Sequence, residues 1–434
     1  MTIGSVWKSW ALPLAACMLL GLAACGGGSS NSDTGLVRLV NTTLNHASLD
    51  LTVNSTAVVQ GTAKDTVSNY AGVGAGSPTL QVNDSGTATA LTTIAPTISG
   101  SLHYGIIVYE SNGIVRAAVI GEDNTAPAVG SAQMRVLDVA PEAGALDVYV
   151  TDPAGALTSP SFTIPAQASA FTSGLLTFSA GTFRIRVTGQ GNVNDLRLDI
   201  PSVTLTSQQT VTVVLSASVG GVLLDGGVLV QQGTYTASRN TNARVRLATG
   251  VLSAASVGAV AGGSTVVSAP VTSPAVGAYV VVPANSALTV NVNGVVSPVT
   301  GTLSAGSDAT LLVTGTPATP TSTLIADDNH LPTSNTVYKM RLVNGLSGAA
   351  ATQTLTADFA VIASGVAPNT ASGYGTGQGS TAARLDVQPL GMTTSSLTLF
   401  NNAVYSVFVF GDPSVPLGTA NNPNVPTQIL RRDR

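Results

Sequence analysis

The sequence predicts an all-β protein built from tandem Ig-like antiparallel β-sandwich domains. Charged residues make up only 9% of the 434 residues, so Glu and Lys, which favour helices, are scarce. Short segments that alternate apolar and polar residues recur between turn residues, which is the pattern of half-buried strands. Similar segments also return at intervals of about 95 to 111 residues, which is the size of one sandwich domain.

The N-terminal segment predicts export and lipid attachment. Lys8 precedes an apolar run over residues 11–24, which is shorter than the roughly 20 residues of a membrane-spanning helix. The run ends in LAAC, which resembles a bacterial lipobox. That resemblance implies cleavage before Cys25 and acylation of this cysteine. We therefore expect a lipoprotein signal peptide over residues 1–24.

Two alternatives stay open for this segment. A second LAAC ends at Cys17, although cleavage there would leave the apolar residues 18–20 on the mature protein. The other alternative is an ordinary signal peptide with an incidental cysteine. After Cys25, the Gly- and Ser-rich residues 26–35 predict a flexible tether. The first of them, Gly26, resembles an outer-membrane sorting signal, so we expect an anchor in the outer membrane, facing the periplasm or the cell surface.

Four segments open alike, each with the pattern apolar, Arg, apolar, apolar, polar. They are VRLVN (37–41), MRVLD (134–138), VRLAT (245–249) and MRLVN (340–344). We predict four sandwich repeats with these bounds: 36–125, 133–232, 243–326 and 338–430. Polar connectors are expected near residues 121–132, 232–243 and 326–338. The tether, with the lipidated cysteine, occupies residues 25–35.

The end of the first repeat predicts a β-hairpin. Residues 103–124 read HYGIIVYESNGIVRAAVIGEDN, with two apolar runs on either side of Ser111-Asn112-Gly113. Asn-Gly between alternating apolar residues is a strong signal for a two-residue hairpin turn. The other three repeats end in a similar way. The last residues, 431–434, are predicted to be a frayed polar tail.

The start of the second repeat supports a family resemblance. MRVLDVAPEAGALDVYV (134–150) resembles the opening of bacterial repeats known as domain of unknown function 4397 (DUF4397), which read V-R-x-x-x-A-x-P-x-A-x-x-x-D-V-Y-V. The resemblance is partial in the first repeat and weak in the third and fourth. It implies lipid-anchored, Ig-like β domains and names no reaction. Members often carry His at a position where this chain has Asn41, Asp138, Thr249 and Asn344, so any role of that His is absent here.

The arginines of the four opening segments have two interpretations. In one, each repeat carries a ligand-binding arginine. In the other, which we favour, the arginine is structural and lies on the solvent face of its strand or pairs with a nearby carboxylate such as Asp50 or Asp147. The four residues are Arg38, Arg135, Arg246 and Arg341.

Acidic pairs at the ends of the first and third repeats are weak candidates for calcium ligands. They are Glu122 with Asp123, and Asp327 with Asp328. Ca²⁺ takes six to eight oxygen ligands, and the second and fourth repeats lack the pattern. We therefore expect solvated linker carboxylates and no metal site. The histidines, His46, His103 and His330, share no metal-ligand spacing.

These observations favour a non-enzymatic structural, adhesive or interaction module without a cofactor. No G-x-S-x-G motif or phosphate-binding loop stands in the required context. A net charge of −4 and the lack of a basic stripe argue against nucleic acid as a partner. The expected partner is the membrane, through the lipid anchor, with an unknown protein or glycan ligand. A glycan-binding surface protein is the alternative, and a hydrolase with an unrecognised site is less favoured.

Overall fold

The computed structural model describes residues 33–157, 164–167, 172–348 and 351–434. The predicted signal peptide, Cys17, Cys25 and most of the tether lie outside these residues. Strands are nearly the only regular secondary structure in the described chain, and its one helix is a 3₁₀ turn at Pro141–Ala143. No helix among the described residues is long and apolar enough to cross a bilayer.

The first eight strands form two four-stranded sheets, which we call sandwich 1. The sheet orders are β4-β1-β7-β8 and β3-β2-β5-β6. The bounds are β1 (Thr34–Asn41), β2 (Ser48–Val53), β3 (Thr56–Ala63), β4 (Ala71–Gly74), β5 (Leu80–Asp84), β6 (Ala90–Ile94), β7 (His103–Ser111) and β8 (Ile114–Gly121).

Sandwich 2 follows with the orders β12-β9-β15-β16-β17 and β11-β10-β13-β14. Its strand β17 lies inside the segment 232–243 that was predicted to be a connector, where it extends the sheet beside β16. The bounds are β9 (Ser131–Asp138), β10 (Leu146–Thr151), β11 (Ile164–Gln167), β12 (Leu176–Ser179), β13 (Gly181–Gly189), β14 (Leu196–Leu205), β15 (Thr210–Ala217), β16 (Leu224–Val230) and β17 (Tyr235–Ser238).

Sandwich 3 has one sheet in the order β22-β18-β26-β27, with β23 also on β18, and one in the order β20-β19-β24-β25, with β21 also on β19. The bounds are β18 (Asn242–Thr249), β19 (Ser256–Ala261), β20 (Ser264–Thr265), β21 (Val271–Thr272), β22 (Ala275–Val276), β23 (Val280–Pro283), β24 (Leu288–Val292), β25 (Val295–Pro298), β26 (Asp308–Gly315) and β27 (Pro320–Asp327).

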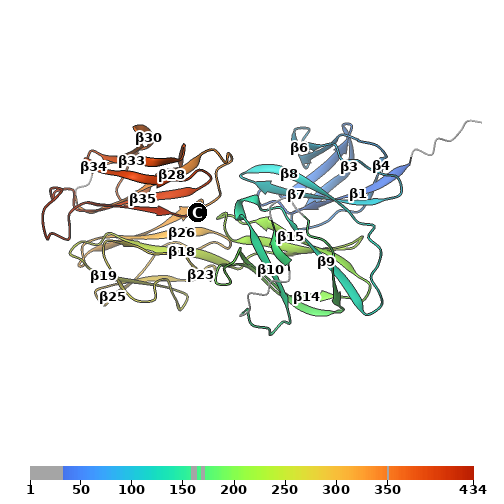
Figure 1. The fold of residues 1–434 in the computed structure, drawn as a ribbon, viewed down its shortest axis with the longest axis horizontal. Coiled ribbons are helices and arrows are strands. Elements are labelled where there is room, and N and C mark those ends of the chain that lie inside the picture. The colour runs from blue at the N-terminus through green and yellow to red at the C-terminus, as the bar shows by residue number, and fades with distance from the viewer. Residues whose placement is uncertain (1–32, 158–163, 168–171, 349–350) are drawn as a thin grey trace, which may run out of the picture. The chain divides into compact units, whose positions relative to one another are not determined.

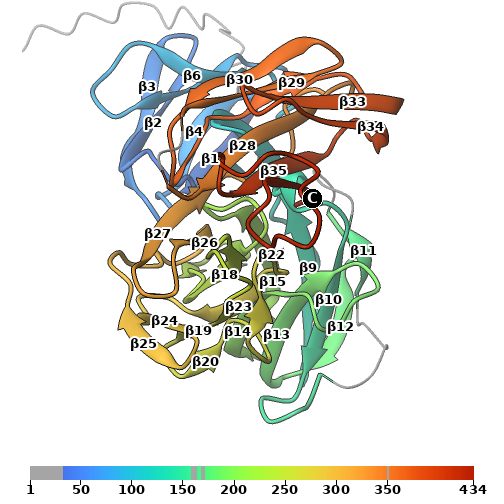
Figure 2. The ribbon, with the colours of Figure 1, turned by 90° about the vertical axis from the view of Figure 1, so that its left-hand side faces the viewer.

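Sandwich 4 has the orders β31-β28-β35-β36, with β32 also on β28, and β30-β29-β33-β34. Figure 2 shows its two layers, with β29, β30, β33 and β34 over β28 and β35. The bounds are β28 (Tyr338–Leu346), β29 (Gln353–Ala357), β30 (Ala360–Val366), β31 (Thr370–Ala371), β32 (Gly375–Gly377), β33 (Ser380–Gln388), β34 (Met392–Leu399), β35 (Val404–Gly411) and β36 (Thr427–Arg432).

All four sandwiches share one topology, which confirms the all-β class and the tandem sandwich architecture (Figure 1). The third and fourth sandwiches have both sheets, as the first two do. One feature was not predicted: the opening strands β1, β9, β18 and β28 pair in parallel with β7, β15, β26 and β35, the first strands of the closing hairpins. Such pairing is possible because the long connection between them, most of which forms the opposite sheet, returns the chain to the same end.

The predicted hairpin of sandwich 1 is present. Strands β7 and β8 pair antiparallel from Ser111 with Ile114 onward. Asn112 and Gly113 form the turn, with φ of 51° and 73°. Positive φ at both central residues is the geometry of a type I′ turn, which Asn-Gly favours because both residues tolerate left-handed backbone.

Each sandwich has its own apolar core between its two sheets. Two further buried apolar clusters join neighbouring sandwiches. One contains Val40 and Ile107 of sandwich 1 with Leu137 and Val214 of sandwich 2. The other contains Leu312 of sandwich 3 with Val343, Phe408 and Phe410 of sandwich 4. The sheets that carry the opening strands are therefore covered on both faces, which explains why β15, β28 and β35 are buried at every residue.

Candidate functional site

The four recurring arginines occupy one register position in the fold. Each lies on the opening strand of its sandwich, and its register partner is a small residue of the neighbouring parallel strand. The pairs are Arg38 with Gly105, Arg135 with Thr212, Arg246 with Thr310, and Arg341 with Ser406. Alternate residues of the opening strand fill the core of the sandwich, so the arginines point from the opposite face toward the neighbouring sandwich.

In sandwiches 3 and 4 each of these arginines binds a carboxylate of the other sandwich. Arg246 of sandwich 3 makes a bidentate contact with Asp433, which follows the last strand of sandwich 4. Arg341 of sandwich 4 binds Asp327, which ends the last strand of sandwich 3. These four side chains are at most 2% exposed. Two buried ion pairs therefore cross this interface in opposite directions.

In each of these two sandwiches a hydroxyl group links the arginine to a carboxylate. Arg246 Nε donates to Thr310 Oγ1 over 2.9 Å, and Thr310 Oγ1 donates to Asp327 Oδ2 over 2.6 Å. In sandwich 4 the same arrangement repeats, because Arg341 Nε donates to Ser406 over 3.0 Å and Ser406 donates to Asp433 over 2.6 Å. Buried charges are stable only when they are paired and hydrogen-bonded, and here both conditions are met.

A tyrosine accompanies the arginine in three of the four sandwiches. The Tyr279 ring centroid is 4.5 Å from Arg246 Cζ, and its hydroxyl donates to Asp327 Oδ2 over 2.5 Å. Burial and the nearby Asp327 raise the pKa of Tyr279 well above its usual value. The corresponding residues, Tyr70 and Tyr374, have ring centroids 5.0 Å from Arg38 and Arg341. The tyrosine is an aromatic contact for the guanidinium in all three, and Tyr70 and Tyr279 also donate a hydrogen bond to the carboxylate.

Sandwich 1 keeps its ion pair within one domain. Arg38 donates to both oxygens of Glu122, over 2.7 and 2.5 Å, and Tyr70 also donates to Glu122. The arginine reaches sandwich 2 through neutral groups only, because it donates to the carbonyls of Val230 and Gly233.

In sandwich 2 the arginine has no carboxylate bonded to it among the described residues. Arg135 donates to Thr212 over 2.9 Å and to the Gly121 carbonyl over 2.8 Å. Gln231 occupies the position in sandwich 2 that Glu122 occupies in sandwich 1. Each residue directly follows the second strand of the closing hairpin, and its backbone N–H donates to the carbonyl of the residue that begins the first strand, Thr210 in β15 and His103 in β7. Burial lowers the pKa of Arg135 from its usual value.

Pairing of the arginine with a carboxylate is confirmed for Arg38, Arg246 and Arg341, but the solvent-facing position and the suggested partners are wrong. Arg38, Arg246 and Arg341 are buried at the interfaces and do not lie on a solvent face. The suggested partners have other roles: Asp50 accepts hydrogen bonds from Ser85 and backbone N–H groups of its own sandwich, and Asp147 accepts one from Gly191. The arginine faces away from the sheet that carries these aspartates.

The acidic residues considered as calcium ligands are held by cationic or polar side chains. Glu122 binds Arg38, and Asp327 binds Arg341. Asp123 lies 2.8 Å from His103 and accepts from Gln232, whereas Asp328 contacts His330 and Lys339. Among the described residues, no group of three or more His, Cys, Asp or Glu side chains is placed to hold a metal ion.

The C-terminal segment is not a frayed tail. Strand β36 pairs with β35 up to Arg432, and the Asp433 side chain is 0% exposed in its contact with Arg246. The expectation failed because the four polar residues carry no local signal of burial, and the partner of Asp433 lies 187 residues earlier in the chain.

Asp138 is the one acidic residue among the four polar residues that close the opening segments. The equivalent Asn41 and Asn344 each accept a backbone N–H with the side-chain oxygen and donate through the amide to a strand carbonyl. Asp138 accepts from the Ala140 N–H in the same way, but its second oxygen has no partner in the described chain. Burial, together with the charge of Glu142, raises the pKa of Asp138 to about 7.

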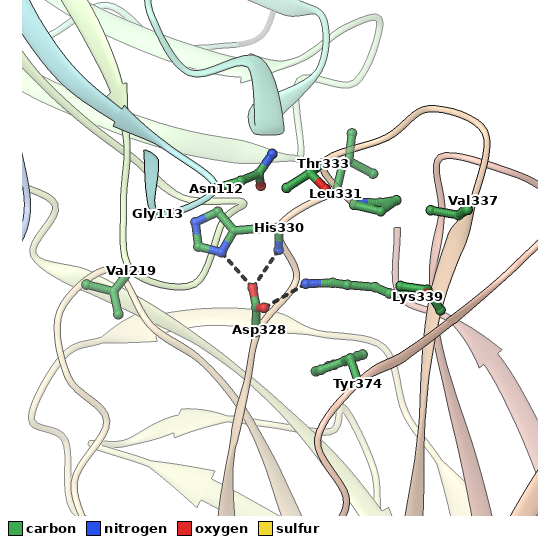
Figure 3. A pocket seen from close by; sticks show the side chains of 12 residues that line it. Asn112, Gly113, Val219, Asp328, His330, Leu331, Thr333, Val337, Lys339 and Tyr374 are labelled. Carbon is green, nitrogen blue, oxygen red and sulfur yellow. Dashed lines mark hydrogen bonds and ion pairs between the residues drawn. The ribbon is translucent and has the colours of Figure 1, made fainter. Parts of the chain in front are cut away.

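A pocket of about 440 Å³ lies where the sandwiches meet, and we call it the junction pocket (Figure 3). The hairpin turn of sandwich 1 contributes Asn112, the segment after β15 contributes Val219, and the segment after β27 contributes Asp328 and His330. Lys339 of β28 completes the polar part. Elements from all four sandwiches thus line one cavity.

One carboxylate organises the charged groups of the junction pocket. Asp328 Oδ1 lies 2.6 Å from His330 Nδ1, and Oδ2 accepts from Lys339 Nζ over 2.7 Å. Partial burial alone would raise the pKa of Asp328, but the hydrogen bonds from His330 and Lys339 outweigh it and hold the pKa well below its usual value. Burial lowers the pKa of Lys339, and Asp328 counteracts part of this effect.

The remaining histidines lie elsewhere. His46 lies between two carboxylates of sandwich 1, with Nδ1 2.6 Å from Asp84 and Nε2 3.4 Å from Glu110. His103 packs edge-on against Tyr70 and binds Asp123. His330 lies in the segment 326–338 that the sequence predicts to be a connector, and no local pattern predicts a pocket there. The signal that was available is the segment Asp327-Asp328-Asn329-His330, in which polar groups follow the end of a strand.

Comparison with known proteins gives a family match over part of the chain and distant structural relatives. Residues 35–149 match the profile of a family described as a domain of unknown function (DUF4397). This region spans sandwich 1 and the strands β9 and β10 of sandwich 2, and the match confirms the predicted resemblance. No curated protein matches the chain.

Two solved structures are similar at low identity. One, from Bacteroides uniformis, is described as a candidate cell adhesion protein; it is 12% identical, with a TM-score of 0.20, and the match covers 46% of this chain and 97% of that one. The other is the Bacillus anthracis TIE protein, which is 8% identical, with a TM-score of 0.15, over 65% of this chain and 50% of that one. At these TM-scores the likeness carries no argument about function.

Proposed function

We propose that the protein is a non-enzymatic module of the bacterial cell envelope, anchored by a lipid on Cys25, that serves a structural, adhesive or interaction role. The observation that carries this proposal is the joining of sandwiches by buried arginine–carboxylate contacts and apolar clusters. Domains in one chain usually meet through small polar interfaces that permit motion. Here buried ion pairs cross between sandwiches 3 and 4, and buried apolar clusters lie in the contacts of both pairs, which favours a fixed geometry.

The use of the buried ionisable groups supports a non-enzymatic role. Catalytic acids and bases need a free face toward a substrate. Arg246, Arg341, Asp327 and Asp433 instead saturate one another in a region that is at most 2% exposed. The strongest electrostatic arrangement in the described chain therefore serves the architecture.

The anchor follows from the sequence. Acylation of Cys25 would hold the sandwiches at a bilayer, since acyl chains contribute about 0.8 kcal/mol per buried CH₂ and stable anchoring takes more than one chain. The Gly- and Ser-rich residues 26–35 supply a tether of the kind that keeps folded domains clear of the headgroups. The proposed site is the outer membrane.

Cell fractionation combined with protease accessibility tests this proposal. Wild type and Cys25→Ala are expressed in a diderm host, and membranes are separated from soluble material. We expect wild type in the outer-membrane fraction and Cys25→Ala in the soluble fraction. Cleavage of wild type on intact cells would assign the sandwiches to the cell surface, and protection would assign them to the periplasm. Equal membrane retention of both proteins would contradict lipid anchoring at Cys25.

A further inference from the structure

The junction pocket contains polar groups that the fold does not use. His330 Nδ1 is hydrogen-bonded to Asp328, and Nε2 makes no hydrogen bond within the described chain. In Figure 3 this nitrogen points away from Asp328, toward the hairpin turn at Asn112 and Gly113. The side-chain amide of Asn112 likewise has no partner among the described residues, because only its backbone N–H is bonded. The Asp328 side chain is 56% exposed, so its carboxylate remains accessible from the pocket.

The charges in the junction pocket select against ions. Asp328 is ionised and faces the cavity, so it repels an anion, and Lys339 next to it repels a cation. The charges of Asp328 and Lys339 offset each other. A ligand that matches this site needs donors for the carboxylate and acceptors for the ammonium and the amide, without a net charge of its own.

The walls of the junction pocket add an apolar contribution. Val219, Leu331 and Val337 line it beside the polar groups. A volume of about 440 Å³ lies near the lower end of the range of about 300–1,000 Å³ that is usual for small-molecule sites. Sugars combine adjacent hydroxyls, each a donor and an acceptor, with an apolar C–H face.

From this arrangement we propose that the junction pocket binds a neutral sugar unit of a glycan. Asp328 accepts from sugar hydroxyls, Lys339 and the Asn112 amide donate to them, and the apolar wall contacts the C–H face. The inference deepens the interaction role proposed above by naming a ligand class. It also gives the fixed geometry a purpose, because Asn112 and Lys339 belong to sandwiches at opposite ends of the chain and must be held within one cavity.

Titration with free sugars tests the proposal. The full chain carrying Cys25→Ala is titrated with glucose, galactose, mannose and N-acetylglucosamine, and with glucuronate and inorganic phosphate as charged comparators. Saturation-transfer NMR and calorimetry report binding. We expect at least one neutral sugar to bind with a dissociation constant on the order of 1 mM, as is usual for so small a ligand. Both comparators should bind more weakly than that sugar.

Matched variants locate the site. Asp328→Asn should weaken binding roughly tenfold, since a hydrogen bond to a charged group is lost. The control is Asp123→Asn, which changes a carboxylate that also contacts a histidine but lies outside the junction pocket. This control should leave the affinity within about twofold. If Asp328→Asn lowers the melting temperature, Asn112→Gly serves instead, because glycine accepts the positive φ of the turn and removes only the amide.

Three results would overturn the inference: no binding of any neutral sugar, tighter binding of glucuronate or phosphate, or an affinity that neither pocket variant changes. The anchor proposal is tested separately, because fractionation depends on Cys25 and the titration uses a chain without it. Sugar binding by a protein that fails to fractionate with membranes would refute the anchor alone. Membrane retention without sugar binding would refute the ligand alone.

Discussion

The two joined pairs of sandwiches differ in how the arginines buried between the domains are paired with carboxylates. In both pairs, arginines of the opening strands lie between the domains and an apolar cluster closes the contact. In sandwiches 3 and 4 each arginine binds the carboxylate of the other domain. In sandwiches 1 and 2 the opening-strand arginine Arg38 pairs within its own sandwich, and Arg135 binds neutral oxygens. The ion pair that does cross between them, Arg239 of sandwich 2 with Asp65 of sandwich 1, is 29% and 31% exposed. Separation of sandwiches 3 and 4 breaks two buried ion pairs, whereas separation of sandwiches 1 and 2 leaves the pair of Arg38 with Glu122 intact, so sandwiches 3 and 4 should depend on each other more strongly.

The same substitution at the shared register position sharpens this comparison. Methionine keeps the aliphatic stem and removes the guanidinium. Arg246→Met leaves Asp433 buried without its cation. Arg341→Met removes the hydrogen-bonded cation of Asp327, which keeps only the 4.0 Å contact with Arg246. We expect each to cost about 3–5 kcal/mol of unfolding free energy, the usual cost of breaking a buried pair. Denaturant titration of the full chain, with hydrogen exchange to assign the transition, measures the loss. A loss below about 1 kcal/mol would refute the structural role of these arginines.

Arg38→Met should have a smaller effect. Glu122 keeps the hydrogen bond from Tyr70, just as Asp327 keeps those from Tyr279 and Thr310 in Arg341→Met. The effect is smaller because the broken ion pair lies within one sandwich and only carbonyl contacts to sandwich 2 are lost. We expect a loss of about 2–3 kcal/mol, in the range for hydrogen bonds to charged groups. The loss should appear mainly in sandwich 1 by hydrogen exchange. A larger loss than for Arg341→Met would reverse the proposed order of the two interfaces.

Asp138→Asn should stabilise sandwich 2 at alkaline pH. The folded pKa of Asp138, about 7, is above its unfolded value near 3.8, so the folded state binds the proton more tightly. The wild type should therefore lose stability as the pH rises from about 4 to about 7, and the loss should persist above 7. Asparagine, the residue at the equivalent positions 41 and 344, supplies a donor at every pH. We expect a gain of about 1–3 kcal/mol at pH 8 and a flatter profile. Equal slopes for both proteins would contradict the assignment.

Arg135→Met should have the smallest effect of the series. No carboxylate is bonded to Arg135 in the structure, so its removal leaves no anion behind. The loss should be about 1 kcal/mol or less, the value of an ordinary hydrogen bond. A thermal melt of this variant beside Arg341→Met makes the comparison direct. A loss equal to that of Arg341→Met would show that the counter-ion exchange is not what distinguishes the two pairs.

The sequence predicted what depends on local pattern. Alternation identified the strands, Asn112-Gly113 identified the hairpin turn, and the recurring arginines identified the repeats. The partners of the arginines could not be predicted in this way, because Glu122 lies 84 residues from Arg38 and Asp433 lies 187 residues from Arg246. Finding them requires the sheet order, which places the end of the last strand beside the start of the first.

The junction pocket was missed for a related reason. Its polar groups come from segments between strands, and such segments have no periodicity that shows which way a side chain points. Asp328 attracted notice as an acidic residue near a domain end, but its contacts with His330 and Lys339 depend on how β27 leads into β28. Only the packing of the sandwiches brings Asn112 to the same cavity.

The most direct test of the account is hydrogen exchange with mass spectrometry on Arg341→Met. If the arginines join sandwiches through exchanged carboxylates, protection should fall in β26 and β27 of sandwich 3 as well as in β28 and β35 of sandwich 4. The strands β1 and β7 of sandwich 1 should keep their protection. A loss confined to sandwich 4 would contradict the account, because it would show that Arg341 stabilises only the domain that carries it.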